Sequence, residues 1–472
     1  MKVFLAIINL LFSLRALKTF SFLVYLWQLK EYRWDRLWLY CQTSTGKQEI
    51  RNQLILNWRP WPVWRPQWTK RASLLFGLSL VLFSLVSYPW LRFLTGLKLL
   101  IGWLVLSLTL PVFVLFASFL VSLPARLVKR RLVKQAKEKI KALPELLVIG
   151  ITGSYGKTAT VHILAKVLST KYRVLQTPEN QNTLFSIAQV VNNQLKPRHQ
   201  IFIVEMGAYK KGEIAEICQL VKPKIGIVIG INYQHLGLFK TFGSLLTAKY
   251  ELIKALPKDG LAVFNAKNRY TLAMAKKTKL KTRLFATKPT NYPTNLIGFW
   301  QQQNIDAALA VAQELKVPRQ QALKELTRIP AFPQQVTIKT GFNRAVIIDD
   351  SYSINPDGFM AALKLFKNYP EFQKIVITSG LIELGYKQAG SYRLLAKKIS
   401  LAKVNQLVLL KQEAYDQLTQ AFKKISRRPE LIVLTELPAL KDWLKTNLNN
   451  QSVILLEGRM LAGLTGFLTC QF

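Results

Sequence analysis

The sequence predicts an α/β protein of two domains that follows a group of N-terminal transmembrane helices. Two long uncharged apolar runs lie before residue 125, and a strand-length run, a glycine turn and a helical pattern begin near residue 145. Strand and helix patterns then alternate to the end of the chain, which is typical of mostly parallel sheets. A chain of 472 residues also exceeds the size of one compact core.

The two apolar runs occupy residues 72–91 and 99–124. Each is long enough to cross a hydrocarbon layer about 30 Å thick at about 1.5 Å per residue. A buried helix of a soluble protein rarely stays apolar on all faces over such a length. Because the link between the runs is short, we expect a transmembrane hairpin.

Basic residues flank this predicted hairpin on both sides. The segment RLVKRRLVKQAKEKIK follows it at residues 126–141. The preceding stretch contains Arg51, Arg59, Arg65, Lys70 and Arg71, together with Trp58, Trp61, Trp64 and Trp68. Positive flanks stay on the cytoplasmic side, and tryptophans favour the membrane interface. We therefore expect a multi-pass protein of the cytoplasmic membrane whose later domains face the cytoplasm.

The opening segment, residues 3–28, is apolar but is interrupted by Arg15 and Lys18. It is interpreted as a third span or a re-entrant segment. An amphipathic helix in the membrane plane and a signal peptide are the alternatives. No small-residue cleavage site follows the apolar run, which disfavours the signal peptide.

The formal net charge of +41 favours an anionic partner. No zinc-finger spacing, RNA-recognition motif or basic zipper region is present, so we expect an anionic membrane surface or substrate and no nucleic acid. The cysteines, Cys41, Cys218 and Cys470, lie far apart without metal-ligand spacing. This pattern indicates a reducing cytosol for the polar part of the chain.

The stretch VIGITGSYGKTAT at residues 148–160 has the order strand, glycine loop, helix that makes a phosphate-binding loop credible. Gly153 and Gly156 let backbone N–H groups converge on phosphate oxygens at the positive end of the helix. Lys157 would reach the β- and γ-phosphates, and the Thr158 hydroxyl would bind magnesium. The predicted ATP-binding residues of this loop are Thr152, Gly153, Ser154, Tyr155, Gly156, Lys157 and Thr158.

Six further motifs follow this loop in a fixed order. They are TPENQNT (177–183), VEMGAYKKGEI (204–214), INYQHLGLFKTFGSLLTAKYELI (231–253), QQNIDAALAVAQEL (302–315), IIDDSYSINPDGFMAAL (347–363) and SGLIELG (379–385). The series resembles the Mur ligase family over about residues 144–472, and most closely its enzymes that add D-alanyl-D-alanine to a UDP-muramoyl peptide. Such ligases phosphorylate a carboxylate with ATP, and an amine then attacks the acyl phosphate.

The resemblance implies catalytic roles for Lys157, Glu205, His235 and Lys249. Glu205 matches the acidic residue that holds magnesium, at the end of an apolar strand where an open α/β sheet places its chemistry. His235 matches a ligand of a second metal. Lys249 matches a lysine that becomes carbamoylated and bridges the metals. With Thr158, these residues form the implied metal site, and ATP and Mg²⁺ are the implied cofactors.

The resemblance also implies contacts with nucleotide and substrate. Asn304 matches the asparagine that contacts adenine, and Asp350 matches the aspartate that reaches the ribose. Substrate contacts are implied for Thr177, Asn180, Asn182, Tyr352 and Asn355.

Several positions depart from the family pattern, mainly on the substrate side. A glycine and an asparagine of the 177–183 stretch are replaced by Glu179 and Thr183, and an N-D-D stretch reads Asn265, Ala266 and Lys267. Gln334 and Gln335 stand where an arginine is usual, and Glu457 stands where relatives carry a lysine. The usual UDP-binding first domain is also missing from the pattern.

These patterns predict three parts: a membrane anchor at 1–143, an ATP-binding Mur ligase central domain of the P-loop type at 144–330, and a Rossmann-like C-terminal domain at 331–472. Strands are expected near 146–151, 201–205, 225–231, 261–265, 344–349, 374–378, 405–410, 430–434 and 452–456. ATP is expected between the last two domains.

We therefore expect a membrane-anchored, ATP-dependent amide ligase that acts through an acyl phosphate in peptidoglycan or cell-wall precursor synthesis. Membrane lipid and a cell-wall precursor, lipid-linked or bound at the surface, are the expected partners. The anchor could instead only localise an ordinary D-alanyl-D-alanine-adding enzyme whose UDP sugar is held by a partner protein. A membrane-bound polyglutamate-type synthase and a non-catalytic ATP-binding scaffold are further alternatives.

Overall fold

The computed structural model describes residues 2–42, 44–54, 65–298, 300–330, 336–352 and 355–469. The chain forms two compact units, Met1–Arg131 and Leu132–Phe472. The predicted boundaries at 143/144 and 330/331 stay predictions.

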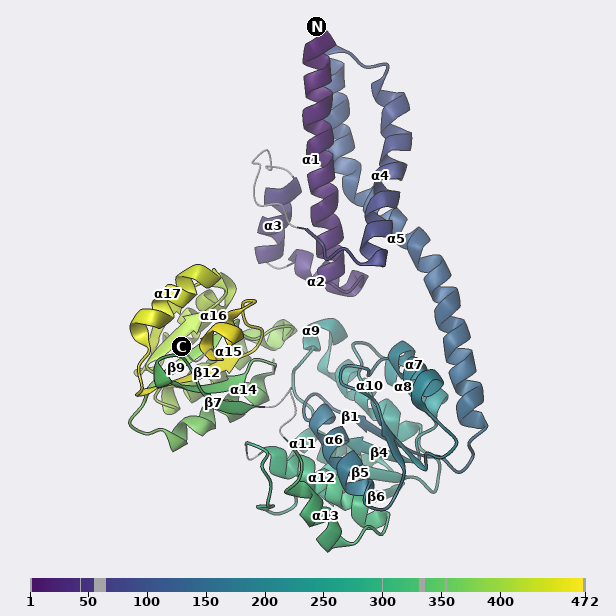
Figure 1. The fold of residues 1–472 in the computed structure, drawn as a ribbon, viewed down its shortest axis with the longest axis vertical. Helices are drawn as coiled ribbons and strands as arrows, with labels where there is room; N and C mark the ends of the chain where they lie inside the picture. Colours follow the sequence, from purple (N-terminus) through teal and green to yellow (C-terminus); the bar gives the residue numbers. More distant parts are fainter. Residues whose placement is uncertain are drawn as a thin grey trace. The chain divides into compact units, whose positions relative to one another are not determined.

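The first unit is helical (Figure 1). Its elements are α1 (Lys2–Leu29), α2 (Trp34–Gln42), α3 (Ser44–Leu54), α4 (Lys70–Leu91) and the first part of α5 (Gly96–Lys141). Phe12 of α1 stacks on Trp103 of α5 with ring centroids 5.5 Å apart. The indole of Trp103 donates a hydrogen bond to Asn9 Oδ1 (2.8 Å). Aromatic packing and buried indole hydrogen bonds thus join α1 to α5.

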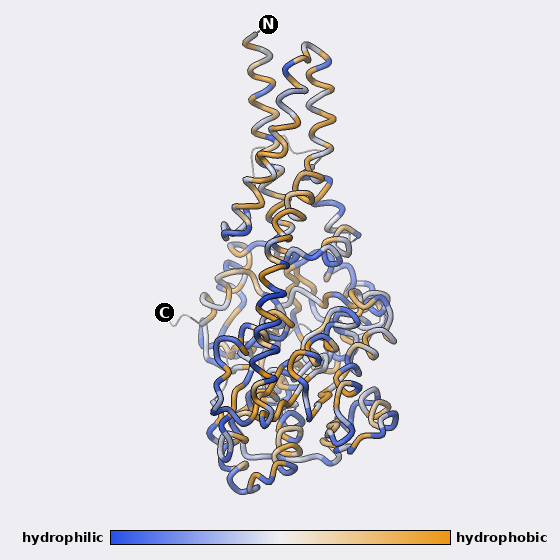
Figure 2. The backbone as a smooth tube through the Cα atoms, turned by 90° about the vertical axis from the view of Figure 1, so that its right-hand side faces the viewer, coloured by the Kyte–Doolittle hydropathy of each residue, from blue (hydrophilic) through white to orange (hydrophobic). Residues whose placement is uncertain are grey.

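Much apolar surface of this unit faces outward. Leu108 and Val112 of α5 are 76% and 61% exposed. Figure 2 shows hydrophobic residues along these helices and hydrophilic residues in the last part of α5. Among the described residues, three helical segments are long and apolar enough to cross a membrane, namely Ala6–Leu29, Lys70–Leu91 and Gly96–Lys141. They contain the runs predicted at 72–91 and 99–124 and most of the segment 3–28. Trp58, Arg59, Trp61 and Trp64 lie outside the described residues.

The second unit contains two six-stranded sheets. The first is parallel throughout in the order β2-β3-β1-β4-β5-β6. Its strands are β1 (Leu147–Thr152), β2 (Val174–Gln176), β3 (Ile201–Glu205), β4 (Ile225–Val228), β5 (Leu261–Asn265) and β6 (Lys281–Phe285). The central strands are continuous apolar runs because both faces of a parallel sheet are covered.

Helices cover this first sheet on its two faces. One face packs on α6 (Lys157–Leu168), α12 (Trp300–Glu314) and α13 (Arg319–Leu326). The other packs on α7 (Leu184–Gln194), α8 (Glu213–Val221), α10 (Phe242–Lys254) and α11 (Arg269–Lys277). The end of α5 joins this second face through buried Ala136 and Ile140, and Lys139 donates a hydrogen bond to the Asn192 carbonyl (2.8 Å). The short helix α9 (Leu236–Phe239) precedes α10.

The second sheet has the order β11-β10-β9-β12-β8-β7. Its strands are β7 (Thr337–Thr340), β8 (Val346–Asp350), β9 (Gln373–Thr378), β10 (Gln406–Leu409), β11 (Glu430–Val433) and β12 (Ser452–Glu457). Only the β7–β8 pair is antiparallel among these described strands. One face packs on α14 (Pro356–Ala362), the 3₁₀ turn Leu363–Asn368, α15 (Gln388–Leu401) and α16 (Gln412–Phe422), and the other on α17 (Leu437–Asn447) and α18 (Leu464–Thr469).

The α/β class with two mostly parallel sheets is confirmed, and each of the nine predicted strands has a counterpart. Sequence patterns missed the edge strands β2, β6 and β7. β2 has three residues, and most side chains of β6 and β7 are not buried, so neither carries the apolar run of a central strand. The P-loop and Rossmann-like assignments stay predictions.

Candidate active site

The glycine loop between β1 and α6 requires its glycines. Gly156 begins α6 with φ +75°, and a Cβ there would come within 2.6 Å of Asn304 Oδ1. A Cβ on Gly153 would lie 3.0 Å from the Gly230 carbonyl oxygen, which already accepts a hydrogen bond from Ser154 N (2.7 Å). The loop therefore lies against the end of β4 and leads directly into the first turn of α6. Free N–H groups at such a helix start favour an anion.

Lys157, Thr158 and Glu205 meet beside this loop. The ammonium of Lys157 donates to the Gly153 carbonyl (3.2 Å), and the Thr158 hydroxyl donates to Glu205 Oε2 (2.8 Å). Burial lowers the pKa of Lys157, and the charge of Glu205 opposes that shift. A hydroxyl and a carboxylate next to a phosphate-binding loop are the hard oxygen ligands that Mg²⁺ prefers. The residues present therefore fit a magnesium–nucleotide site.

Glu205 is held by two of the predicted substrate residues. Its side chain is almost fully buried at the end of β3. Its backbone N–H donates to Thr177 Oγ1 (2.9 Å), and Asn182 Nδ2 donates to its Oε1 (2.9 Å). Thr177 and Asn182 thus position the carboxylate that faces the phosphate loop.

Lys249 of α10 is buried near the same group of charges. Burial, followed by the positive charge of Lys157, lowers the pKa of Lys249 to about 7, although Glu213, Glu205 and Glu251 oppose the shift. The uncharged form of Lys249 is therefore much more accessible at neutral pH than that of an exposed lysine. An uncharged amine is a nucleophile, unlike the ammonium of an exposed lysine.

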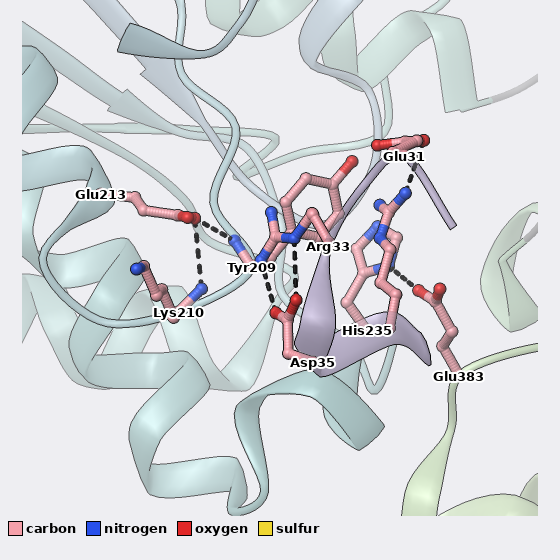
Figure 3. Close-up of polar contacts among 9 residues, drawn as sticks. Glu31, Arg33, Asp35, Tyr209, Lys210, Glu213, His235 and Glu383 are labelled. Carbon is pink, nitrogen blue, oxygen red and sulfur yellow. Dashed lines mark hydrogen bonds and ion pairs between the residues drawn. The ribbon is translucent and has the colours of Figure 1, made fainter. Parts of the chain in front are cut away.

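His235 lies between two side chains from different parts of the second unit. Its ring meets the edge of the Tyr209 ring at a centroid distance of 5.0 Å, and its Nδ1 lies 2.5 Å from Glu383 Oε2 (Figure 3). Burial lowers the pKa of His235, and Glu383 opposes this effect. Electrostatic interactions with Lys249 and Lys157 place His235 in the same cluster.

The predicted nucleotide contacts outside the loop are also buried. Asn304 of α12 lies against Gly156 and donates to Gln301 Oε1 (3.0 Å). Asp350 ends β8 directly opposite Glu457 of β12. Burial, together with the charge of Asp349, raises the pKa of Asp350 to about 7, and burial beside Asp350 holds the pKa of Glu457 well above its ordinary value. Burial and mutual proximity therefore favour the protonated form of this pair of carboxyl groups.

The remaining predicted substrate residues join the two sheet domains. The Tyr352 hydroxyl donates to Asn180 Oδ1 (2.5 Å). Asn232, which follows β4, donates through its Nδ2 to Asn355 Oδ1 (3.3 Å) and to Asp357 Oδ2 (3.0 Å). The C-terminal sheet domain is thus hydrogen-bonded to the central domain through the loops that carry these residues.

Among the described residues that depart from the family pattern, Glu179 and Asn265 contact neighbouring side chains. Glu179 Oε1 lies 3.5 Å from His162 Nε2 of α6. Asn265 donates to Gln303 Oε1 (3.0 Å) and accepts from Lys267 N (2.9 Å). Gln334 and Gln335 lie outside the described residues.

Comparison with known proteins places the chain in a family. Residues 151–319 match the Mur ligase middle domain, and residues 335–460 match the domain described as "Mur ligase, glutamate ligase domain". Together the two matches cover more than half of the chain. It belongs to the Mur ligase family. Because the members of this family are ATP-dependent ligases, the predicted enzyme class is confirmed.

Relatives of this Mur ligase include two enzymes named UDP-N-acetylmuramoyl-tripeptide–D-alanyl-D-alanine ligase. The Synechocystis enzyme is 27% identical over 67% of this chain and 72% of its own length, and the Treponema pallidum enzyme is 24% identical over 67% and 73%. Crystal structures of MurF from Acinetobacter baumannii (TM-score 0.61, 22% identity) and of MurF from Thermotoga maritima in complex with ADP (TM-score 0.60, 21% identity) share its fold. Each structure covers 70% of this chain, and this chain covers 77% and 80% of theirs.

Three residues of this Mur ligase site were not predicted: Asn232, Tyr209 and Glu383. All three lie inside motifs that carry the family resemblance, so a signal was present, but no pattern indicated their contacts. Among the described residues, no three His, Cys, Asp or Glu side chains cluster as a ready metal site. The predicted metal ligands are one glutamate, one histidine, one threonine and one lysine. Metal binding by this set would therefore need the predicted carbamate at Lys249 and oxygen atoms of the nucleotide.

Proposed function

We propose that this Mur ligase is a membrane-anchored enzyme that joins an amine to a carboxylate of a cell-wall precursor, in the manner of the D-alanyl-D-alanine-adding enzymes. One observation carries the proposal. Lys157, Thr158, Glu205, His235 and Lys249 come from four segments of the chain, yet hydrogen bonds or electrostatic interactions connect them beside one glycine loop.

The reaction follows from these groups. The loop N–H groups and Lys157 would bind the phosphates of ATP, and Thr158 and Glu205 would hold a magnesium ion, which would supply neutralisation of phosphate charge. The acceptor carboxylate attacks the γ-phosphorus, so the bond to the bridging oxygen breaks and ADP leaves. The amine then attacks the carbonyl carbon of the acyl phosphate, inorganic phosphate leaves, and the amine loses a proton. Positioning and charge neutralisation supply most of the rate.

Lys249 is proposed to act as a carbamate. Its uncharged amine adds CO₂ and releases a proton, which converts a buried cation into an anion with two oxygen ligands. The depressed pKa of Lys249 supports this step because only the neutral amine can attack. The Lys249 carbamate would offset the positive charge of Lys157 and complete an oxygen-rich metal site with Glu205.

The acceptor is proposed from the first part of the chain. The first of the two family matches begins at residue 151, whereas helices apolar enough to span a membrane occupy the preceding part. The basic segment 126–141 would attract anionic lipid at the cytoplasmic face. We infer an acceptor that lies at the membrane, such as a lipid-linked precursor. The names of the relatives favour a soluble UDP-linked tripeptide as the second candidate.

Phosphate release by the full-length protein in lipid nanodiscs tests these assignments. The protein receives MgATP and D-Ala-D-Ala with either UDP-muramoyl tripeptide or its lipid-linked counterpart. Faster release with the lipid-linked acceptor is expected, and equal or faster release with the soluble precursor would contradict the membrane acceptor. Release with glutamate alone would indicate a polyglutamate-type synthase. Nucleotide binding without any turnover would indicate a scaffold.

A further inference from the structure

Glu383 connects the C-terminal sheet domain to His235. It lies in the loop after β9, outside the set of residues predicted for the site. Its side chain reaches His235 Nδ1 at 2.5 Å, and its backbone carbonyl accepts a hydrogen bond from Gly237 N at 2.9 Å. One residue therefore contacts the histidine loop through both its side chain and its main chain.

The backbones at this junction fit closely. Glu383 itself adopts a left-handed φ of +58°, which a non-glycine residue rarely does without a compensating contact. A Cβ on Gly385 would lie 3.2 Å from Gly237 Cα, and one on Gly237 would lie 3.4 Å from the Glu383 carbonyl oxygen. The ammonium of Lys387 lies 5.7 Å from the Tyr233 ring centroid and extends the contact. The position of Glu383 is thus set by the docking of the two domains.

His235 depends on this carboxylate for its orientation. Its backbone is also left-handed (φ +61°), and the Tyr209 ring meets the imidazole in an edge-to-face contact. A carboxylate at Nδ1 favours the tautomer that carries its proton on Nδ1 and leaves the Nε2 lone pair free. Metal-binding histidines commonly have such a carboxylate partner.

We propose that Glu383 is a positioning residue that prepares His235 for metal binding only when the C-terminal domain is docked. This inference rests on the metal role proposed for His235. It gives the ligase a physical link between domain docking and the metal site, since separating the domains removes the carboxylate from Nδ1. The second metal would then bind weakly to the undocked enzyme.

Imidazole NMR tests the link without any turnover. The chain has three histidines, so ¹⁵N-histidine labelling gives three sets of ring signals, each with one Nδ1 and one Nε2 resonance. His162 and His199 serve as internal references. In the metal-free, full-length protein, His235 is expected to carry its proton on Nδ1. Glu383→Ala should convert it to a mixture of tautomers or to the Nε2-protonated form. Glu371→Gln, an exposed change in the same domain, should leave all three signals unchanged. An unaltered His235 signal in Glu383→Ala would overturn the proposal.

Manganese titration followed by electron paramagnetic resonance provides the second measurement, in the presence of a non-hydrolysable ATP analogue. Glu383→Ala should weaken the second Mn²⁺ by about 10- to 100-fold. Glu383→Gln keeps the shape, and its amide oxygen can still accept a hydrogen bond from Nδ1–H, so it should recover part of the affinity and control for misfolding. Equal Mn²⁺ binding by all three proteins would contradict the proposal. Both readouts remain informative if no ligase activity is found, so they separate this inference from the proposed function.

Discussion

The predicted nucleotide side and the predicted acceptor side of this site differ in their agreement with the family pattern. Glu205, Lys249 and Asn304 are each 4% exposed and keep the residue types that the resemblance requires. On the acceptor side, Tyr352 is 49% exposed, and Glu179 and Thr183 replace the usual residues. The residues matched to ATP activation therefore keep the family pattern, whereas the loop matched to the acceptor departs from it at Glu179 and Thr183.

The largest expected effect is on the nucleotide side. Lys157→Ala should reduce phosphate release by about 100- to 1,000-fold, because it removes a positive charge from the predicted phosphate site. Lys254→Ala, on the exposed side of α10, is the matched control and should retain full activity. Rapid turnover by Lys157→Ala would remove the basis for placing the γ-phosphate beside the loop.

Substitutions of two asparagines in one loop can test separately the predicted nucleotide side and the predicted acceptor side of the site. Asn182→Ala removes a hydrogen bond to Glu205 and should raise the KM for MgATP by about 10-fold or more. Asn180→Ala removes the partner of Tyr352 and should instead raise the KM for the acceptor. Steady-state kinetics with each substrate varied in turn gives both values. Identical effects of the two variants would mean that the sides are not distinct.

Restoring a family residue tests the acceptor side directly. Glu179→Gly removes a carboxylate that would repel an anionic acceptor. Turnover of UDP-muramoyl tripeptide should rise by about 3- to 10-fold, while the KM for MgATP stays the same. Thr183 provides a comparison, because it caps α7 and its replacement should act on stability instead. A change in the MgATP KM alone would contradict the assignment of Glu179.

The last expected effect is on stability rather than on turnover and concerns Lys249. Its pKa falls from an ordinary 10.5 to about 7 in the folded protein, so between these values the unfolded chain binds more protons. Stability should therefore rise with pH across this range, by up to about 1.4 kcal/mol per unit. Lys249→Met should lose that slope and be more stable than the parent near pH 7. Urea unfolding at several pH values in CO₂-free buffer measures the difference.

Sequence patterns predicted the central strands and the glycine loop because both have local signatures, whereas the other residues of the nucleotide side were implied by the family resemblance. A buried parallel strand is a continuous apolar run, and the phosphate loop joins its glycines, lysine and threonine within seven residues. The edge strands β2, β6 and β7 lack such a run. Contacts such as Glu383 with His235 or Asn232 with Asp357 depend on how two domains dock, over separations of 148 and 125 residues. No local pattern carries that geometry.

The carboxyl pair at the edge of the C-terminal sheet has a consequence for how the enzyme treats its cosubstrate. A lysine opposite Asp350 would hold a permanent cation beside the ribose subsite at any cellular acidity. Glu457 places a titratable carboxyl group opposite Asp350 in the position of that fixed charge. If Asp350 contacts the ribose as predicted, nucleotide binding by this ligase should vary with pH near neutrality, because burial raises the pKa of Asp350 to about 7.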